Sequence, residues 1–202
     1  SATPDGAYMS LSMVEAAISR LQEARVANIT VTGGEPLVHP DLSRILELLV
    51  DGGFEVTVCT NGVTLTDDLI ERALTLGHIS FNVSVDGITA DSHGRFRGRR
   101  DSFERTLNSV HRLGDAGLLK GVLSTPHSLA HADEYEAVYE LAERAGAEYL
   151  LMNPLSSFGR GIRSRGRLKA DEKTMTDVMR GVEEAAVKHP TEAVFIRFPN
   201  ED

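Results

Sequence analysis

The sequence has one cysteine, no tryptophan and few aromatic residues. With a single cysteine among 202 residues, no disulfide can form within the chain, and no metal site that needs several thiolates can be built from it. No apolar run approaches the roughly 20 residues of a membrane span, and no signal peptide opens the sequence. Acidic residues outnumber basic ones by 30 to 21, and the net charge of −9 argues against nucleic acid or an anionic membrane as the main partner. We therefore expect a cytoplasmic protein with neither kind of partner.

What the sequence does contain is a regular alternation of helical and strand-like apolar patterns. Strands are expected at residues 28–32, 55–59, 79–85, 119–124, 148–152 and 193–198. Helices are expected at residues 12–22, 41–52, 66–74, 102–117, 133–145 and 173–187, the first of them with a capping box formed by Ser12 and Glu15. Strict alternation of this kind is typical of a parallel sheet with right-handed crossovers.

The order of these elements predicts an α/β fold that resembles an incomplete barrel. The series begins with a helix rather than a strand, and the six expected strands are too few for a closed eight-stranded barrel of about 250 residues. We expect a single domain over residues 1–202, a partial (β/α)6 TIM-like barrel that lacks its first strand. Ligands of such folds bind at the carboxyl ends of the strands, so the residues directly after each strand form the candidate site.

The first strand is followed by a turn with two glycines, a carboxylate and a proline: Gly33, Gly34, Glu35 and Pro36. The glycines leave the backbone bare, so that a ligand can approach closely. The carboxylate can accept charge-assisted hydrogen bonds from an ammonium group, and the proline fixes the turn. The alternative interpretation is an ordinary tight turn.

Polar residues also follow the second strand and occupy the third. Thr60 and Asn61 form either an ordinary turn or a pair of polar groups at the mouth of the sheet. In the third strand Asn82, Ser84 and Asp86 share one face, because strand residues alternate between faces. A polar face of a barrel strand is costly unless it meets a ligand or water, so it indicates a binding site, with an edge strand as the alternative.

Two basic clusters interrupt this acidic chain, and both are expected in loops at the same end of the sheet. They comprise Arg95, Arg97, Arg99 and Arg100 after the third strand, and Arg160, Arg163, Arg165, Arg167 and Lys169 after the fifth. Together they can form a positive mouth for a carboxylate or an acidic peptide. The alternative is two solvated loops.

Other chemistry-bearing residues are weaker candidates. Cys59 lies within a strand, where a free cysteine is most often a small core hydrophobe. His127 and His131 have the spacing of a helical metal site, but His127 follows a proline in an expected loop, so a metal site is not favoured. One hypothesis remains an unrelated barrel enzyme that uses Asp86, His127 or Glu35 as acid, base or metal ligand.

The ordered set of strand-end motifs resembles the radical S-adenosylmethionine (SAM) superfamily. The motifs are Gly33-Gly34-Glu35-Pro36, Thr60-Asn61-Gly62, Ser84-Val85-Asp86-Gly87 and Arg97-Gly98. Together with the order of strands and helices, the resemblance covers nearly the whole chain. The loop from Asn153-Pro154-Leu155 to Gly161 resembles the branch with a C-terminal auxiliary-cluster (SPASM) domain, which includes enzymes that modify ribosomally made peptides or mature cofactors.

This resemblance implies a partial barrel that holds SAM and a 4Fe–4S cluster bound by a Cys-x-x-x-Cys-x-x-Cys loop. An electron donor would reduce the cluster, SAM would be cleaved to a 5′-deoxyadenosyl radical, and that radical would abstract hydrogen from a peptide or small-molecule substrate. The site residues that the resemblance implies are Gly33, Gly34, Glu35 and Pro36 for the SAM ammonium, Thr60 and Asn61 near the pocket wall, Ser84 for the ribose or carboxylate, Asp86 in the same pocket, and Asn153 and Leu155 in the loop after the fifth strand. Arg97 is a candidate for the SAM carboxylate, with Arg95 and Arg99 as competitors.

The sequence departs from the family at its cysteines. Its only cysteine, Cys59, lies after the Gly-Gly-Glu-Pro turn, where the family has no cluster ligand. We therefore expect a core fragment without the first strand, the cluster loop and the auxiliary-cluster domain, and hence inactive as given; no catalytic residue or metal ligand is assigned. The alternative is a cluster-free module that binds a peptide or protein partner.

Overall fold

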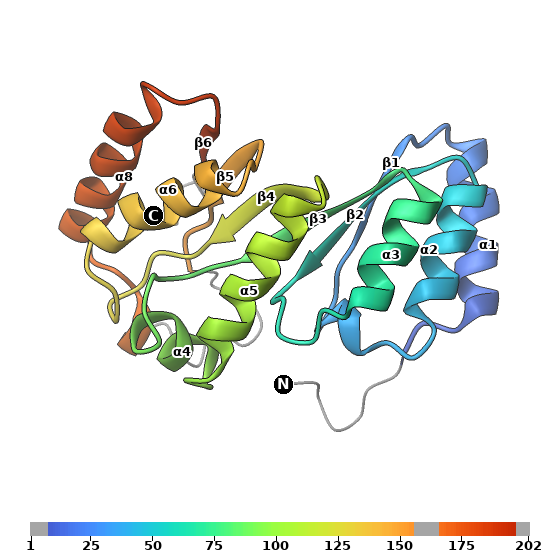
Figure 1. Ribbon diagram of the computed structural model, residues 1–202, viewed down its shortest axis with the longest axis horizontal. Coiled ribbons are helices and arrows are strands. Elements are labelled where there is room, and N and C mark those ends of the chain that lie inside the picture. The colour runs from blue at the N-terminus through green and yellow to red at the C-terminus, as the bar shows by residue number, and fades with distance from the viewer. Residues whose placement is uncertain (1–7, 156–165, 197–202) are drawn as a thin grey trace.

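The computed structural model describes residues 8–155 and 166–196, and their strands form one sheet (Figure 1). All neighbouring strands are parallel, and the order in the sheet is the order in the chain. The strands are β1 (Asn28–Val31), β2 (Glu55–Thr60), β3 (Ile79–Ser84), β4 (Leu119–Ser124), β5 (Tyr149–Met152) and β6 (Glu192–Phe195). In the described part of the chain β1 and β6 each pair on one side only, so the sheet is open, which confirms the partial barrel.

Helices connect the strands and cover one face of the sheet. They are α1 (Leu11–Glu23), α2 (Leu42–Asp51), α3 (Asp67–Leu76), α4 (Ser92–Arg97), α5 (Ser102–Asp115), α6 (Asp133–Arg144) and α8 (Glu172–Ala186), with a short 3-10 helix η1 (Pro36–Val38) after β1. Figure 1 shows α1, α2 and α3 beside one half of the sheet and α5, α6 and α8 beside the other. When consecutive parallel strands are neighbours in the sheet, right-handed crossovers place all connecting helices on the same face. The other face of the sheet becomes the inner face of the open barrel.

The strand predictions are confirmed, and the ends of the first five strands differ from the expected ones by at most one residue. The last expected strand, 193–198, extends beyond the described residues, and β6 ends at Phe195. Two local predictions are wrong. Helix α1 is capped by Ser10 instead of Ser12: Ser10 has an extended backbone, and its hydroxyl accepts a hydrogen bond from the Met13 N–H at 3.3 Å, whereas Ser12 is already helical.

The second error concerns the first basic cluster, which was expected in a loop. Arg95 and Arg97 lie in helix α4, which the sequence analysis did not predict. This helix has only six residues and contains Gly94, so it shows no apolar periodicity that could reveal it.

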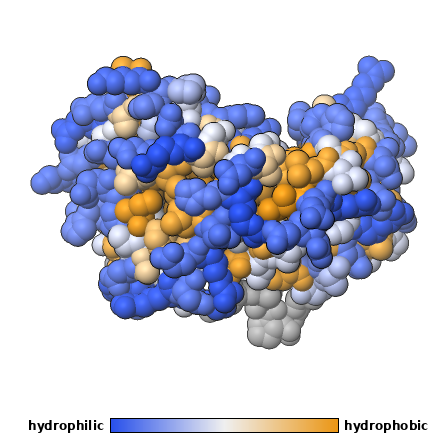
Figure 2. Space-filling model, in the orientation of Figure 1, coloured by the Kyte–Doolittle hydropathy of each residue, from blue (hydrophilic) through white to orange (hydrophobic). Residues whose placement is uncertain are grey.

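The hydrophobic core lies between the sheet and its helices. Val58, Phe81 and Val83 are completely buried on the helix-facing side, and each contributes roughly 1.5–3 kcal/mol by burial. Figure 2 shows apolar residues in a band across the middle of the viewed face, with hydrophilic residues around it. No helix among the described residues combines the length and apolar character needed to cross a membrane.

The inner face of the sheet carries a row of polar side chains from β2, β3 and β5, with a glycine of β4 between them. The strand register places Cys59, Asn82, Gly121 and Tyr149 side by side. The Tyr149 hydroxyl donates to Asn82 Oδ1 at 2.8 Å, and Asn82 Nδ2 donates to Cys59 Sγ at 3.7 Å. Cys59 is half-buried on this face and outside the hydrophobic core, so its interpretation as a core residue is wrong. Burial raises the pKa of both the Cys59 thiol and the Tyr149 phenol, so both groups stay neutral.

Candidate functional site

The turn after β1 has an open side. Gly33 has a φ of 144°, a conformation that favours glycine, and a Cβ added at Gly33 or Gly34 would meet no atom within 4 Å. The backbone of this turn is therefore accessible to a ligand at close range. Pro36 follows at the start of η1 and is buried, which fixes the far side of the turn.

The carboxylate of Glu35 ties this turn to the end of β2. It accepts hydrogen bonds from the Leu37 N–H at 3.1 Å, from the Asn61 N–H at 2.8 Å and from the Thr60 hydroxyl. A carboxylate offers about four acceptor positions, so at most one remains for a ligand. Glu35 is thus an anchor first, and the bare backbone of the two glycines is the larger open surface.

Thr60 and Asn61 serve the same anchor. Thr60 is in phase with the buried valines of β2 and is itself 3% exposed, so its side chain lies on the helix-facing side of the strand. Its hydroxyl also accepts from the Gly62 N–H at 3.0 Å. Asn61 is partly exposed, and its side-chain oxygen accepts from the Val63 N–H at 2.8 Å. These contacts shape the second strand end; a direct role in binding remains a prediction.

At the end of β3, Ser84 and Asp86 have contrasting surroundings. Ser84 is partly exposed, and its hydroxyl makes no hydrogen bond to the residues that the structure describes. Asp86 is completely buried, and each of its polar groups is engaged. Its carboxylate accepts from the Thr125 N–H at 3.0 Å and from Arg97 Nε. Its backbone N–H donates to His93 Nδ1 at 3.2 Å, and its carbonyl accepts from the Tyr135 hydroxyl at 3.5 Å.

Asp86 therefore joins β3 to the end of β4, to α4 and to α6. This arrangement also bears on the hypothesis of an unrelated acid–base enzyme. That hypothesis named the carboxylates of Asp86 and Glu35 as acid, base or metal ligand. The oxygens of both already accept hydrogen bonds from the protein, and Asp86 is out of contact with solvent, which disfavours such a role.

Arg97 differs from the other arginines of its cluster. Arg95 and Arg100 pair with the exposed Asp91, and Arg99 pairs with Asp101. These pairs offset part of the positive charge of this first basic cluster. Arg97 pairs with Asp86 through Nε, whereas its two terminal nitrogens have no hydrogen-bond partner among the described residues, and its side chain is 32% exposed. Among the arginines of α4 and its flanks, Arg97 is thus the one whose guanidinium is held at Nε while its two terminal nitrogens remain available to a ligand.

The loop after β5 is described at its start and again from residue 166. The Asn153 N–H donates to the Ser124 carbonyl at 2.8 Å, which continues the pairing of β5 with β4 beyond the strand ends. Asn153 and Leu155 are both partly buried at this strand end. The residues 156–165, with Arg160, Arg163 and Arg165, lie outside the described residues, while Arg167 and Lys169 are exposed.

Two buried histidines lie near Asp86: His127, which the sequence offered as a weak candidate in a loop, and His93, which it did not single out. His93 and His127 are 1% and 0% exposed, and burial lowers the pKa of both, to about 4 for His93. Both rings are therefore neutral. The sequence offered only one indication of His93, its position four residues before the Arg97-Gly98 motif. Its burial could not be predicted, because it depends on helix α4, whose sequence has no apolar periodicity.

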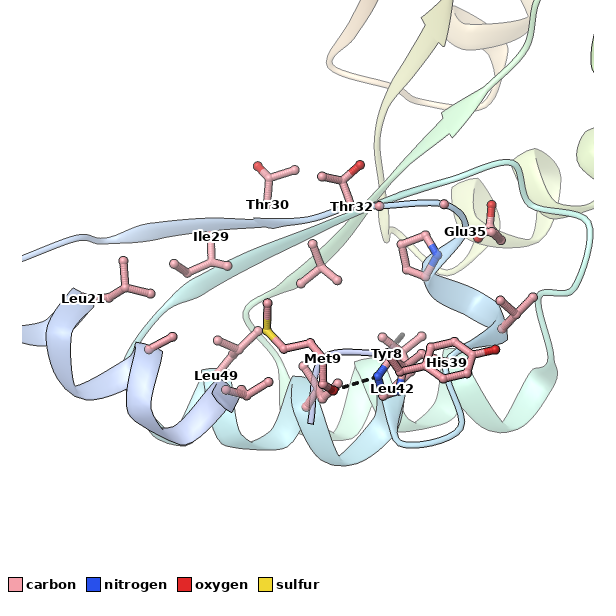
Figure 3. A pocket seen from close by; sticks show the side chains of 18 residues that line it. Tyr8, Met9, Leu21, Ile29, Thr30, Thr32, Glu35, His39, Leu42 and Leu49 are labelled. Carbon is pink, nitrogen blue, oxygen red and sulfur yellow. Dashed lines mark hydrogen bonds between the residues drawn. The ribbon is translucent and has the colours of Figure 1, made fainter. Parts of the chain in front are cut away.

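An apolar groove of about 520 Å³ adjoins the Gly-Gly turn, between β1, α1 and α2 (Figure 3). In Figure 3, Ile29 points toward the helices, whereas Thr30 and Thr32 lie on the other side of the strand. His39 holds the segment that closes one end: its Nδ1 accepts from the Asp41 N–H at 3.0 Å, so Nε2 carries the proton and donates to the Met9 carbonyl at 3.1 Å. The groove follows the free edge of β1, as expected for a barrel without a strand at that side.

The fit of metal groups follows from the side chains present. Within residues 8–155 and 166–196, no three His, Cys, Asp or Glu side chains are grouped so that they could hold a metal ion. His127 is buried, whereas His131 is exposed. A 4Fe–4S cluster needs several thiolates, and the whole sequence has one cysteine, so the cluster does not fit this chain. SAM does fit the strand ends, which offer bare backbone, a free hydroxyl and an oriented arginine.

Two curated enzymes are similar to this chain in sequence. The AdoMet-dependent heme synthase of Methanosarcina barkeri is 35% identical over 136 residues, which cover 67% of this chain and 39% of that protein. The mycofactocin maturase MftC of Mycobacterium tuberculosis is 31% identical over 146 residues, which cover 71% of this chain and 36% of that protein. The chain thus spans about two fifths of the length of these curated relatives.

The fold has solved counterparts. The crystal structure of Streptococcus suis SuiB bound to S-adenosylmethionine aligns with a TM-score of 0.80 at 12% identity and covers 96% of this chain and 45% of SuiB. SuiB bound to its precursor peptide SuiA aligns with a TM-score of 0.79. At this identity the likeness shows the fold alone. The sequence itself matches the radical SAM superfamily over residues 1–142. This chain therefore belongs to the radical SAM superfamily.

Proposed function

We propose that this chain is the SAM-binding core of a radical SAM enzyme that acts in peptide or cofactor maturation. In this family SAM, together with a 4Fe–4S cluster, supplies a 5′-deoxyadenosyl radical for hydrogen abstraction. Because one cysteine cannot ligate the cluster, the chain by itself binds SAM without generating a radical, and the full reaction needs thiolates and an electron donor from elsewhere.

One observation supports the proposal: the residues after β1 and β3, which lie at the same edge of a parallel sheet, have open groups that complement the parts of SAM. The accessible backbone of Gly33 and Gly34 offers carbonyl acceptors for the SAM ammonium, beside the one free acceptor position of Glu35. Arg97, oriented through Nε by the buried Asp86, presents two free nitrogens for a bidentate contact with the carboxylate. Ser84 has a free hydroxyl for the ribose or the carboxylate.

The remaining residues play supporting parts in the proposed site. Thr60, Asn61 and Pro36 keep the Gly-Gly turn in place through Glu35 and η1. Asn153 and Leu155 border the site at the end of β5 and contribute the half-buried wall there.

For the substrate we propose a peptide, or a cofactor precursor derived from one. The supporting observations are the maturases among the relatives and the precursor peptide bound to SuiB. The exposed Arg167 and Lys169 at the far end of the loop after β5 favour an acidic segment of such a peptide.

Calorimetry with SAM and with decarboxylated SAM tests the site. We expect SAM to bind more tightly than its decarboxylated form by about 10-fold or more, the value of a charge-assisted hydrogen-bond pair. R97M should bring the two affinities together by weakening SAM alone. The matched control R95M removes an arginine of the same helix that pairs with Asp91, and it should leave the preference unchanged. Equal affinities in the wild-type chain would refute the role of Arg97, and absence of SAM binding would refute the proposed function.

The single cysteine favours a second candidate, a cluster-free module that binds a peptide. This candidate predicts peptide binding that is independent of both SAM and iron. Fluorescence anisotropy with labelled acidic peptides, with and without SAM, distinguishes the two. The module is supported if the wild-type chain does not bind SAM and R97M binds the peptide as strongly as the wild-type chain does.

A further inference from the structure

The orientation of Arg97 depends on more than its ion pair with Asp86. That pair engages Nε alone, and Arg97 belongs to a helix of six residues whose one other arginine, Arg95, is exposed and paired with the surface residue Asp91. So short a helix has little stability of its own, and its position must come from tertiary contacts. The residue next to Arg97 supplies such a contact.

Phe96 stacks face to face on the ring of His127, which follows β4. The two ring centroids are 4.1 Å apart, and the ring planes differ by 12°. Phe96 and Arg97 come from the same turn of α4: Phe96 lies on His127, Arg97 pairs with Asp86, and the Arg97 guanidinium lies over the Phe96 ring, 5.9 Å from its centroid. The stack therefore fixes how α4 is rotated, and with it where the Arg97 fork points.

His127 is itself held firmly on several sides. Its backbone N–H donates to the Tyr135 hydroxyl at 2.9 Å, and its Nδ1 accepts from the Leu129 N–H at 3.1 Å. The Tyr135 hydroxyl in turn donates to the carbonyl of Asp86. The supports of the stack and the ion pair thus meet at Asp86, so the stack and the ion pair hold the guanidinium together.

The loop that carries His127 is also paired from its outer side. The Ser128 N–H donates to the Leu168 carbonyl at 3.0 Å, and His127 forms an antiparallel bridge with Lys169. The loop is therefore a fixed support for the stack.

His127 Nε2 is buried and has no hydrogen-bond partner within residues 8–155 and 166–196. A buried unpaired donor is unfavourable, so this nitrogen does not explain why the ring occupies the position. What the ring provides is a flat surface for Phe96 and one acceptor for the local turn.

We propose that the Phe96–His127 stack holds Arg97 in the orientation that reads the carboxylate of a bound ligand, with Phe96 and His127 as positioning residues. That Arg97 binds a ligand carboxylate rests on the proposed function. That the stack orients Arg97 concerns the chain alone and can be measured without ligand.

The ligand-free measurement is the Arg97 Nε–H resonance in nitrogen–proton NMR spectra. In the wild-type chain we expect a resonance protected from exchange by the bond to Asp86. F96L and H127L, which remove one face of the stack, should lose this protection by 10-fold or more, while H127F, which keeps an aromatic face, should retain it. The control F103L truncates an aromatic side chain that lies against His93 instead, and it should leave the resonance unchanged. Unchanged protection in F96L would overturn the proposal.

The ligand measurement is the ratio of affinities for SAM and decarboxylated SAM. F96L and H127L should bring this ratio close to that of R97M, whereas H127F and F103L should keep the wild-type ratio. If F96L and H127L weaken the binding of both ligands equally, the ratio stays at the wild-type value. The two rings then support the fold in general and not the orientation of Arg97, and the proposal is overturned. Failure of the wild-type chain to bind SAM would refute the proposed function only, because the Nε–H protection is measured without it.

Discussion

Removal of the charge on Glu35 is the sharpest test of how the strand ends are held together. In E35Q the side-chain oxygen can still accept from Thr60 and Leu37, but the new NH2 group faces the N–H of Asn61, which now bonds to Oε2 at 2.8 Å. A hydrogen bond to a charged group contributes about 1.5–3 kcal/mol, and here an acceptor becomes a second donor. We therefore expect a loss of about 2–3 kcal/mol in the free energy of unfolding.

Urea unfolding followed by circular dichroism measures this loss, and the melting temperature should fall by roughly 4–12 °C. E183Q, on the exposed side of α8, is the matched control and should change stability by less than about 0.5 kcal/mol. T60V removes a partner of the same carboxylate, so the double variant should lose less than the sum of the two single variants. An E35Q chain as stable as E183Q would refute the reasoning, because the carboxylate would then not anchor the turn.

Three further predictions concern the fold. G121A should destabilise the chain by about 1–3 kcal/mol, because its Cβ overlaps the Tyr149 ring; replacement of Tyr149 by alanine in the same chain should make the glycine change nearly neutral in urea unfolding. S10A should cost about 1 kcal/mol in thermal unfolding and S12A almost nothing, and the opposite order would return the helix cap to Ser12. Burial lowers the pKa of His93 to about 4, below its value in the unfolded chain, so protonation favours unfolding. The free energy of unfolding should therefore be independent of this group above about pH 6.5 and fall by roughly 3 kcal/mol as the pH drops to 4. H93N should reduce the difference between the urea midpoints measured at pH 7 and pH 4.5.

The sequence alone was sufficient for the architecture. The alternation of apolar patterns predicted every strand of the sheet and its parallel order, because the period of apolar residues differs between helix and strand and is set by local geometry. The strand-end motifs from Gly33 to Arg97 were also visible, since residues after parallel strands meet at one edge whatever their side chains do.

The contacts of those motifs were decided only by the tertiary structure. Glu35 looked like a free carboxylate and is instead an anchor, because Asn61 and Thr60 come from another strand. Cys59 looked like a core residue and faces the inside of the barrel beside Asn82, because the register between strands assigns the faces. Helix α4 has no pattern of its own and exists through its contacts with buried groups. Periodicity along the chain is a local property, whereas hydrogen-bond partners 25 or more residues apart depend on how the strands are brought side by side.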